Sequence, residues 1–260
     1  MEETPFAHLA PLRDMPIPDQ AAARLAARGA RALPISRGAP SGNEPLADLS
    51  DFGIAGENYY FSERNPPYWR RIAGSIPDLL LRRGVAEKLA GVNARLAQAG
   101  LELFIFDAWR PRAVQRYFHD VWMPAELCRR DPALSGAALT QAVECYWAAP
   151  TRDAASPAPH ETGAAVDLSL RWRSGERLWM GSLFDDVTGI AHRDRFETAS
   201  THALSYSDEE ARANRRLLHW LMSEAGFAGH PNEWWHFSWG DQLWAAFTGG
   251  EVHYGLASPG

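Results

Sequence analysis

The segment that most restricts the fold is the apolar, aromatic run at residues 101–106, which ends at Asp107. A short run of this composition predicts a strand. Hydrophobic residues recur at helical spacing just before it, from Val85 to Leu96, and Gly100 provides a stop. The chain is therefore expected to run from a helix directly into a strand.

Two further helices are predicted after this strand. Pro111 stands where a first helical turn would begin. The apolar face of that helix would carry Val114, Tyr117, Phe118 and Val121. Ser207 and Glu210 match a capping box that begins the second helix, and Gly226 ends it. The apolar positions of this second helix are Leu217, Leu218, Leu221 and Met222.

Two more strands are predicted, at residues 165–170 and 234–239. Helices and strands are mixed without the regular alternation of repeated βαβ units, which indicates the α+β class. Residues 1–50 are rich in Ala, Pro, Arg and Gly. They contain one possible helix after Pro18-Asp19 and a broken stretch through Ser41-Gly42-Asn43. We expect an N-terminal extension (1–50) that wraps one domain (51–245), and a C-terminal tail (246–260).

Composition narrows the classes of function. The chain has 260 residues, of which 46% are hydrophobic, enough to bury a core in one domain or at most two. Its net charge of -6 offers no basic surface for nucleic acid, despite the local cluster Arg110-Pro111-Arg112. The oligomeric state is left open by the sequence.

The sequence also favours a location in the cytoplasm. The N-terminus lacks the basic start and apolar run of a secretory signal. No stretch approaches the ~20 apolar residues of a membrane span, so no membrane partner is expected. Two cysteines, Cys128 and Cys145, are too few for a disulfide framework and form no C-x-x-C pair. A reduced, cytoplasmic protein is the default expectation.

A first candidate site is the segment that runs from His160 through Gly163 to Asp167. A histidine, a turn of small residues and an aspartate on a strand can present an imidazole nitrogen and a carboxylate oxygen to one ion, since zinc accepts both at ~2.0–2.2 Å. The alternative is a surface histidine in a loop, followed by an aspartate that merely begins a strand. Spacing alone does not decide between the two.

A second candidate site lies in the apolar run Glu233-Trp234-Trp235-His236. Burying Glu233 and His236 in such surroundings is costly unless each group has a partner. A metal would supply the partner for His236, and the carboxylate beside it could act as general base toward water activated by the ion. The alternative is that the tryptophans belong to an ordinary core and Glu233 points to solvent. His230, six residues before His236, is expected to be exposed.

A third candidate site is the turn Asp107-Ala108-Trp109-Arg110-Pro111. A strand that runs into a helix begun by proline fixes Arg110 at the end of a rigid element. An arginine in that position could stabilise an oxyanion during peptide hydrolysis. An ion pair between Asp107 and Arg110 that only braces the turn is an equally good interpretation at this point.

Taken together and in this order, the three motifs resemble those of the D-alanyl-D-alanine dipeptidases, a family of zinc peptidases that also includes D-alanyl-D-alanine carboxypeptidases. The family pattern is D-G/A-Y/W-R-P, then H-x-x-G-x-A-x-D, then E-W-W-H. The segments 180–185 and 214–218 also look like family segments. The resemblance covers residues 58–239 and implies a small antiparallel sheet that carries the zinc site, flanked by helices.

Residue by residue, the resemblance implies one zinc ion per chain, held by His160, Asp167 and His236. It makes Glu233 the general base, and the role of Arg110 would be to polarise the carbonyl and steady the tetrahedral intermediate. Asp185 matches the carboxylate that receives the free ammonium group of a small peptide substrate. The alternative interpretation of Asp185 is an aspartate that lies in a turn, next to Asp186.

One departure from the family pattern affects the expected substrate. Two residues before His160 the dipeptidases usually carry a serine that helps to hold substrate, and here the position is Ala158. The resemblance implies hydrolysis of D-alanyl-D-alanine or a similar dipeptide. Two alternatives remain: a carboxypeptidase that trims longer cell-wall peptidoglycan peptides, and a zinc-bearing binding module without catalysis.

Overall fold

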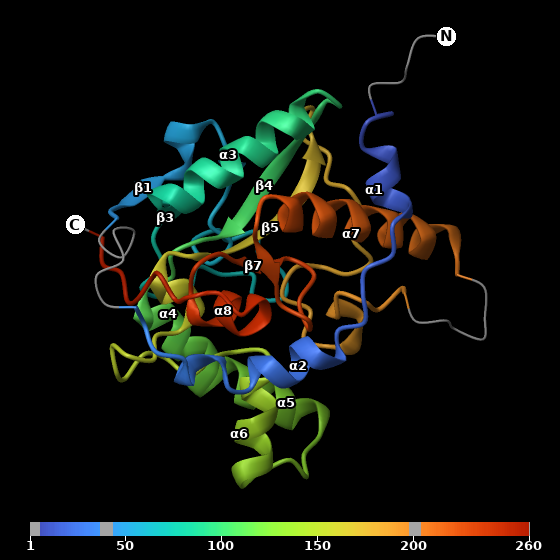
Figure 1. The fold of residues 1–260 in the computed structure, drawn as a ribbon. Helices are drawn as coiled ribbons and strands as arrows, with labels where there is room; N and C mark the ends of the chain where they lie inside the picture. The colour runs from blue at the N-terminus through green and yellow to red at the C-terminus, as the bar shows by residue number, and fades with distance from the viewer. Residues whose placement is uncertain (1–5, 37–43, 198–203, 260) are drawn as a thin grey trace.

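The computed structural model describes residues 6–36, 44–197 and 204–259, and its centre is a five-stranded sheet, of which β4, β5 and β7 are labelled in Figure 1. The strand order is β2-β4-β5-β7-β6. The bounds are β2 (Ala55–Gly56), β4 (Leu101–Asp107), β5 (Ala165–Trp172), β7 (His236–Ser238) and β6 (Ala228–Gly229). A separate two-stranded sheet pairs β1 (Leu46–Asp48) with β3 (Leu80–Arg82).

The sheet is antiparallel except at one edge. β4 pairs with β5, β5 with β7, and β7 with β6, all antiparallel, whereas β2 runs parallel to β4. The α+β class is confirmed, with this parallel pair as a detail that the sequence did not indicate. The predicted strand at 234–239 is shorter than expected, because β7 pairs with β5 only at residues 236–238.

The predicted helix and strand at the start of the domain are confirmed. α3 (Arg83–Ala97) packs against β4, and its buried apolar residues include Val85, Leu89, Val92 and Leu96. α7 (Tyr206–Glu224) packs against β5 and buries Leu217, Leu218, Leu221 and Met222. The hydrophobic core therefore lies between these helices and the central strands.

The helix predicted from Pro111 onward is divided into three parts. α4 (Arg112–Tyr117) passes into a π-helical turn, η4 (Phe118–Trp122), and then into α5 (Met123–Arg130). The prediction that Val121 lies on the buried face is wrong, because its side chain is 55% exposed. The wider π turn changes the angular spacing of the side chains, so the 3.6-residue period fails there.

The N-terminal residues lie against the C-terminal helices. α1 (Ala10–Asp14) packs against α7, and α2 (Ala21–Ala27) with the 3-10 turn η1 (Ala30–Ala32) packs against α8 (Gln242–Thr248). The helix predicted after Pro18-Asp19 is therefore present as α2. The stretch through Ser41-Gly42-Asn43 lies outside the described residues, and the domain boundaries at 50 and 245 stay predictions.

The remaining elements are short helices around the sheet. They are α6 (Gly136–Glu144) and the 3-10 turns η3 (Leu49–Phe52), η5 (Pro159–Thr162) and η6 (Gly189–Ala191). In the part of the chain that the structure describes, none of the helices combines the length and apolar character that crossing a bilayer requires.

The N-terminus of α7 corrects one prediction from the sequence. The capping residue is Ser205, whose hydroxyl accepts a hydrogen bond from the backbone N–H of Asp208 at 3.2 Å. The predicted capping box of Ser207 and Glu210 is therefore wrong, because the helix begins two residues earlier. Ser205 and Asp208 have the spacing of an N-cap and its N3 residue.

Replacing Ser205 with Ala should lower the free energy of unfolding by about 1 kcal/mol, because one helix N–H loses its acceptor. Ser207→Ala is the matched control and should change it by less than about 0.5 kcal/mol. Urea denaturation of both variants measures the difference. A larger loss for Ser207→Ala would show that the cap has been assigned to the wrong serine.

Candidate active site

Strand register brings three polar residues to one level of the sheet. Asp107 at the end of β4 pairs with Asp167 on β5, and Asp167 pairs with His236 on β7. Side chains of directly paired residues project from the same face of a sheet. A register irregularity between Ile105 and Asp107 places Asp107 opposite Asp167. These three side chains therefore meet on one face.

His160 reaches the same point from η5, the turn that precedes β5. Gly163 ends this turn with φ +71°, a conformation that favours glycine. A Cβ atom at Gly163 would also lie 2.4 Å from the Leu46 side chain. Glycine at this position thus lets the chain turn back into β5 with His160 beside Asp167.

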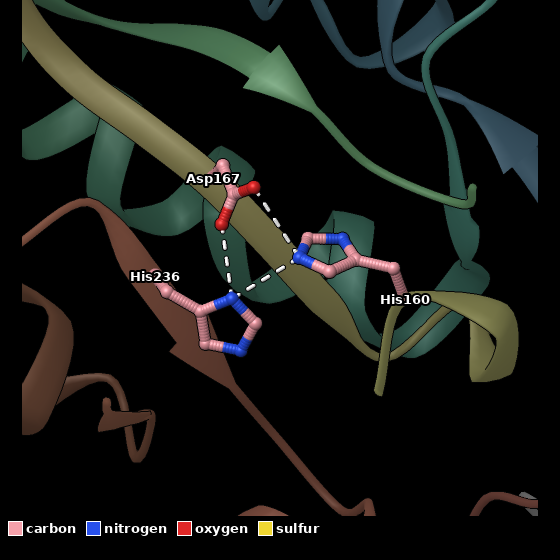
Figure 2. A group of neighbouring side chains, drawn as sticks. All are labelled: His160, Asp167 and His236. Carbon is pink, nitrogen blue, oxygen red and sulfur yellow. Dashed lines mark hydrogen bonds and ion pairs between the residues drawn. The ribbon is translucent and has the colours of Figure 1, made fainter. Parts of the chain in front are cut away.

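His160, Asp167 and His236 form a compact group that can hold a metal ion (Figure 2). His160 Nε2 lies 3.1 Å from His236 Nδ1 and 3.3 Å from Asp167 Oδ2, and His236 Nδ1 lies 3.0 Å from Asp167 Oδ1. Ligands about 2.0–2.2 Å from a tetrahedral zinc ion are about 3.3–3.6 Å apart. The spacing and the donor set of two imidazoles and one carboxylate fit zinc.

The other nitrogen of each imidazole has its own partner. His160 Nδ1 lies 2.8 Å from the carbonyl oxygen of Ala108, which can only accept, so this nitrogen carries the proton. His236 Nε2 lies 3.4 Å from the Ser238 hydroxyl, which in turn donates to Asp241 at 2.9 Å. Contacts of this kind orient metal-binding histidines and leave the second nitrogen free to coordinate.

Burial and neighbouring side chains set the charge states of His236 and Asp167. His160, Asp167 and His236 are each at most 5% exposed. Burial lowers the pKa of His236 to about 4, although Asp167 opposes the shift, so the imidazole is neutral at pH 7. Burial alone would raise the pKa of Asp167, but His160 and His236 hold it well below its ordinary value. Neutral imidazoles and an ionised carboxylate are the forms that bind metal.

Glu233 lies beside this group and does not point to solvent. It is 9% exposed, and its Oε2 is 3.7 Å from His236 Nδ1. Burial raises the pKa of Glu233 well above its ordinary value, and the charges of Asp167 and Asp185 add to the shift. A carboxylate with a raised pKa is a stronger proton acceptor than one in water.

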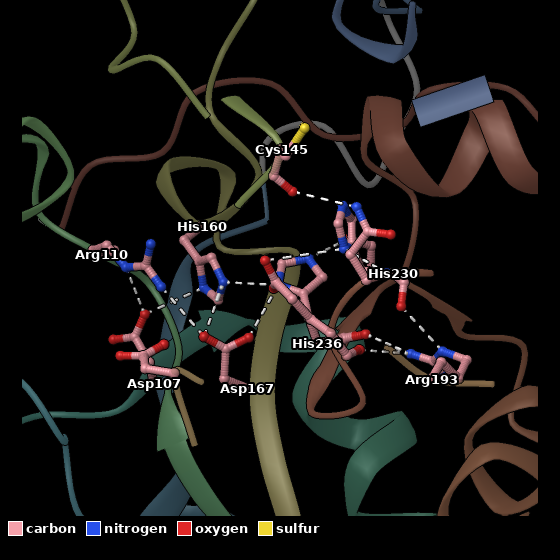
Figure 3. A network of polar contacts seen from close by, with 12 residues as sticks. Asp107, Arg110, Cys145, His160, Asp167, Arg193, His230 and His236 are labelled. Atoms are coloured by element: carbon pink, nitrogen blue, oxygen red, sulfur yellow. Dashed lines mark hydrogen bonds and ion pairs between the residues drawn. The ribbon is translucent and has the colours of Figure 1, made fainter. Parts of the chain in front are cut away.

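Arg110 forms the ion pair with Asp107 that the sequence left open, and it also contacts the metal-binding group (Figure 3). Its Nε donates to Asp107 at 2.8 Å, which braces the turn, and a terminal nitrogen donates to Asp167 at 3.2 Å. Another terminal nitrogen donates to Gln115 at 2.9 Å. The guanidinium is therefore held rigidly beside the metal-binding group.

Asp185 lies in the same site with an unusual backbone conformation. Its φ is +60°, and its Oδ2 accepts hydrogen bonds of 2.9 Å from the hydroxyl groups of Tyr60 and Tyr68. Burial raises the pKa of Asp185 to about 7. No cation pairs directly with this carboxylate among the described residues, which makes its charged form costly in the absence of a ligand.

Three residues of the site were missed or misplaced by sequence reasoning. Tyr60 and Tyr68 had no motif that tied them to Asp185. His230 is not exposed as expected: only 15% of its side chain is accessible, and its Nδ1 lies 4.0 Å from Glu233 Oε1. The hydrogen bond from its backbone N–H to the carbonyl of His236 explains this burial, and such pairing leaves no local sequence signal.

One cavity of about 740 Å³ joins these groups. Its lining includes His160, Asp167, His236, Glu233, Arg110 and Asp185. A buried pair of imidazoles with a carboxylate, open to a cavity and flanked by a second carboxylate and an arginine, is the arrangement of a metal-dependent hydrolase.

Comparison with known proteins gives the family. The model of the Peptidase_M15 family, described as D-ala-D-ala dipeptidase, matches residues 75–250. A D-alanyl-D-alanine dipeptidase from Synechocystis is 38% identical over 217 residues, covering 78% of this chain and 84% of the relative. A D-alanyl-D-alanine dipeptidase from Escherichia coli is 30% identical over 158 residues, covering 61% of this chain and 65% of the relative. The chain belongs to the D-Ala-D-Ala dipeptidase family and is a metallopeptidase.

A solved structure gives a weaker likeness. A mutant form of the vancomycin resistance D,D-pentapeptidase VanY, in complex with Zn(II), is 14% identical, with 84% of this chain and 91% of that chain covered. The TM-score of this match is 0.38.

Asp185→Asn should stabilise the metal-free protein at pH 8 and much less at pH 4. The pKa of Asp185 is raised to about 7 in the folded state. The contribution of this group to stability is therefore fully present at a pH below the ordinary pKa of aspartate, and it is lost as the pH rises from there through 7. The difference between variant and wild type should grow by roughly 1.4 kcal/mol per pH unit across that interval.

Thermal unfolding in the presence of a chelator, at several pH values, measures this difference. Asp186→Asn is the control, since that neighbouring carboxylate is bound only to Thr188 among the described residues. An Asp185→Asn effect that does not change with pH would contradict the burial of an uncompensated carboxylate.

Proposed function

We propose that this protein is a zinc peptidase that cleaves D-alanyl-D-alanine or a similar short dipeptide. The observation that carries the proposal is the group of His160, Asp167 and His236, with Glu233 beside it, at the buried end of a cavity. The relatives named D-alanyl-D-alanine dipeptidase support the substrate. The fit of the donor set supports zinc.

His160 Nε2, Asp167 and His236 Nδ1 would hold the ion, and the cavity side would remain open for water and substrate. Bound zinc would polarise the substrate carbonyl and lower the pKa of water to about 7. The contacts of His160 with Ala108 and of His236 with Ser238 keep both rings in the coordinating orientation.

Glu233 would accept the proton of the attacking water and pass it to the leaving amine. Its distance of 3.7 Å from a nitrogen of the metal-binding group supports this role. The pKa of Glu233, raised by burial, suits a group that must first take a proton and then give it up. The imidazoles of His230 and His236 lie nearest to the Glu233 carboxylate, and burial lowers the pKa of both. Both rings are therefore neutral and do not lower the pKa of Glu233 by a positive charge.

Arg110 would stabilise the negative oxygen of the tetrahedral intermediate. Asp107 and Gln115 hold its guanidinium from two sides, so little reorganisation is needed when charge develops on the substrate. Its hydrogen bond to Asp167 keeps it beside the ligand group. A preorganised donor of this kind contributes about 3–4 kcal/mol to the transition state.

Asp185 would bind the free ammonium group of the substrate. The hydroxyl groups of Tyr60 and Tyr68 orient its carboxylate, and a substrate cation would supply the partner that it lacks among the described residues. A substrate with a blocked amino group would leave this buried carboxylate unpaired. The need for a free amino group distinguishes a dipeptidase from a carboxypeptidase, which acts at the C-terminal end of a longer chain.

The alternatives differ in what they require of these residues. A binding module without catalysis has no use for Glu233 beside the metal group. A carboxypeptidase has no use for Asp185 as an ammonium partner. We also infer a cytoplasmic location, supported by two cysteines that stay free, Cys128 and Cys145.

Glu233→Gln should keep zinc and fold but lower kcat for D-Ala-D-Ala by about 10²–10⁴, since an amide keeps the shape and cannot accept a proton. Glu144→Gln makes the same chemical change at the exposed rim of the cavity and should leave kcat within about twofold of wild type. Amino-acid release and metal content measure the two effects. If Glu233→Gln turns over like wild type, another residue is the base; if the zinc-loaded wild type cleaves no dipeptide, the proposed function is wrong.

A further inference from the structure

The cavity continues beyond the residues that the proposed reaction uses. One end is buried and contains the metal-binding group, Glu233 and Asp185. The other end is accessible and lies between α2 and α6. There the lining residues include Ala27, Arg28, Ala138, Gln141 and Ala142. Arg28, Ala138 and Gln141 are exposed, so this end is the mouth of the cavity.

We call this mouth the α2–α6 groove. Its N-terminal wall, formed by α2 and η1, is fixed to the site. Arg24 on α2 donates to Asp194 at 2.5 Å and to Asn232, next to Glu233, at 3.2 Å. Arg31 in η1 donates to the carbonyl of Ala149 at 2.7 Å. The side chain of Gln242 on α8 donates to the carbonyl of Arg31 at 3.1 Å. The N-terminal segment is therefore a built wall of the cavity.

The whole cavity is larger than a dialanine dipeptide needs. A cavity of about 740 Å³ is in the upper part of the roughly 300–1,000 Å³ range that accepts drug-sized ligands. Its mouth is lined by small side chains at Ala27, Ala138 and Ala142, which leave room for a peptide backbone. The guanidinium of Arg28 at the same mouth forms no hydrogen bond or ion pair with any described residue.

The buried end is closed to any extension of the substrate. Asp185 is 7% exposed, and behind it Tyr60 and Tyr68 pack against Phe118 with ring centroids 4.8 and 4.9 Å apart. An amino group bound to Asp185 thus has no room for a residue before it. Any longer part of the substrate must leave through the mouth.

From this geometry we propose that the α2–α6 groove binds the C-terminal part of peptides longer than two residues. The enzyme then acts on free-amino peptides extended beyond the scissile bond and removes their first residue. This inference rests on the proposed function of Asp185 and Glu233. Water adds its oxygen to the carbonyl carbon of the first residue, the C–N bond breaks, and the proton passes to the new amino group. Arg28 pairs with the C-terminal carboxylate at the mouth.

The test compares three substrates of the zinc-loaded full-length protein: D-Ala-D-Ala, the free tripeptide D-Ala-D-Ala-D-Phe, and N-acetyl-D-Ala-D-Ala. We expect kcat/KM for the tripeptide within about tenfold of that for the dipeptide, and a much lower value for the acetylated one. The first products of the tripeptide should be D-Ala and D-Ala-D-Phe. D-Phe and D-Ala-D-Ala as first products would overturn the proposed orientation.

Variants of α6 locate the effect in the groove. Ala142→Trp should lower the ratio of kcat/KM for tripeptide over dipeptide by about tenfold or more, because the indole fills the mouth. Ala137→Trp is the matched control on the same helix, exposed and outside the cavity lining, and should leave the ratio unchanged. Calorimetry can measure the affinity for the tripeptide in the inactive Glu233→Gln variant. Adding Ala142→Trp to that variant should weaken tripeptide binding by the same factor of about tenfold or more.

Arg28→Ala gives a second variant on an exposed position. It should raise KM for the free tripeptide by about two- to fivefold and leave KM for its C-terminal amide unchanged. Cleavage of D-Ala-D-Ala without cleavage of the tripeptide would overturn the groove inference and leave the dipeptidase function standing. Cleavage of neither substrate would overturn the proposed function, and the groove inference with it.

Discussion

The balance of charge around a group of buried carboxylates is the constraint on which the rest of the site depends. Asp107, Asp167, Asp185 and Glu233 are each at most 9% exposed, and the guanidinium of Arg110 is a cation held among them. Burial raises the pKa of three of them, Asp107, Asp185 and Glu233. Uncompensated buried carboxylates cost several kcal/mol each. A divalent cation at the ligand group and an ammonium group at Asp185 would supply the missing positive charge.

The surrounding fold holds this costly group in place through hydrogen bonds to the backbone. Arg215 on α7 donates to the carbonyls of Met180, His192 and Ile190, which fixes the segment that carries Asp185. Arg193 donates to the carbonyl of His236 at 3.0 Å and so secures β7. Arginines that bind carbonyl groups in this way hold both the irregular segment 180–192 and the short strand β7, so the site stays rigid without a large sheet.

The sequence was most informative where one local rule decides the outcome. The helix before Gly100 was predicted because burial of one face dictates its periodicity, and the strand after it because nearly all of its residues are buried and form a continuous apolar run. The meeting of His160, Asp167 and His236 was predicted because three motifs occur in family order. The register that pairs Asp107, Asp167 and His236 is set by long-range strand contacts, which no local pattern encodes. The contacts of Tyr60 and Tyr68 with Asp185, and the π turn at 118–122, arise in the same way from packing between distant segments.

Metal analysis tests the central claim, that the buried group is organised around one zinc ion. Wild-type protein, His160→Ala and His236→Ala would be loaded with zinc, dialysed and assayed for metal per chain. His230→Ala is the control, a neighbouring histidine whose ring centroid is 5.7 Å from that of His236 but which is outside the ligand group. The account predicts one zinc per chain in wild type and in His230→Ala, and a large loss in the other two. Equal zinc content in His236→Ala and wild type would contradict it.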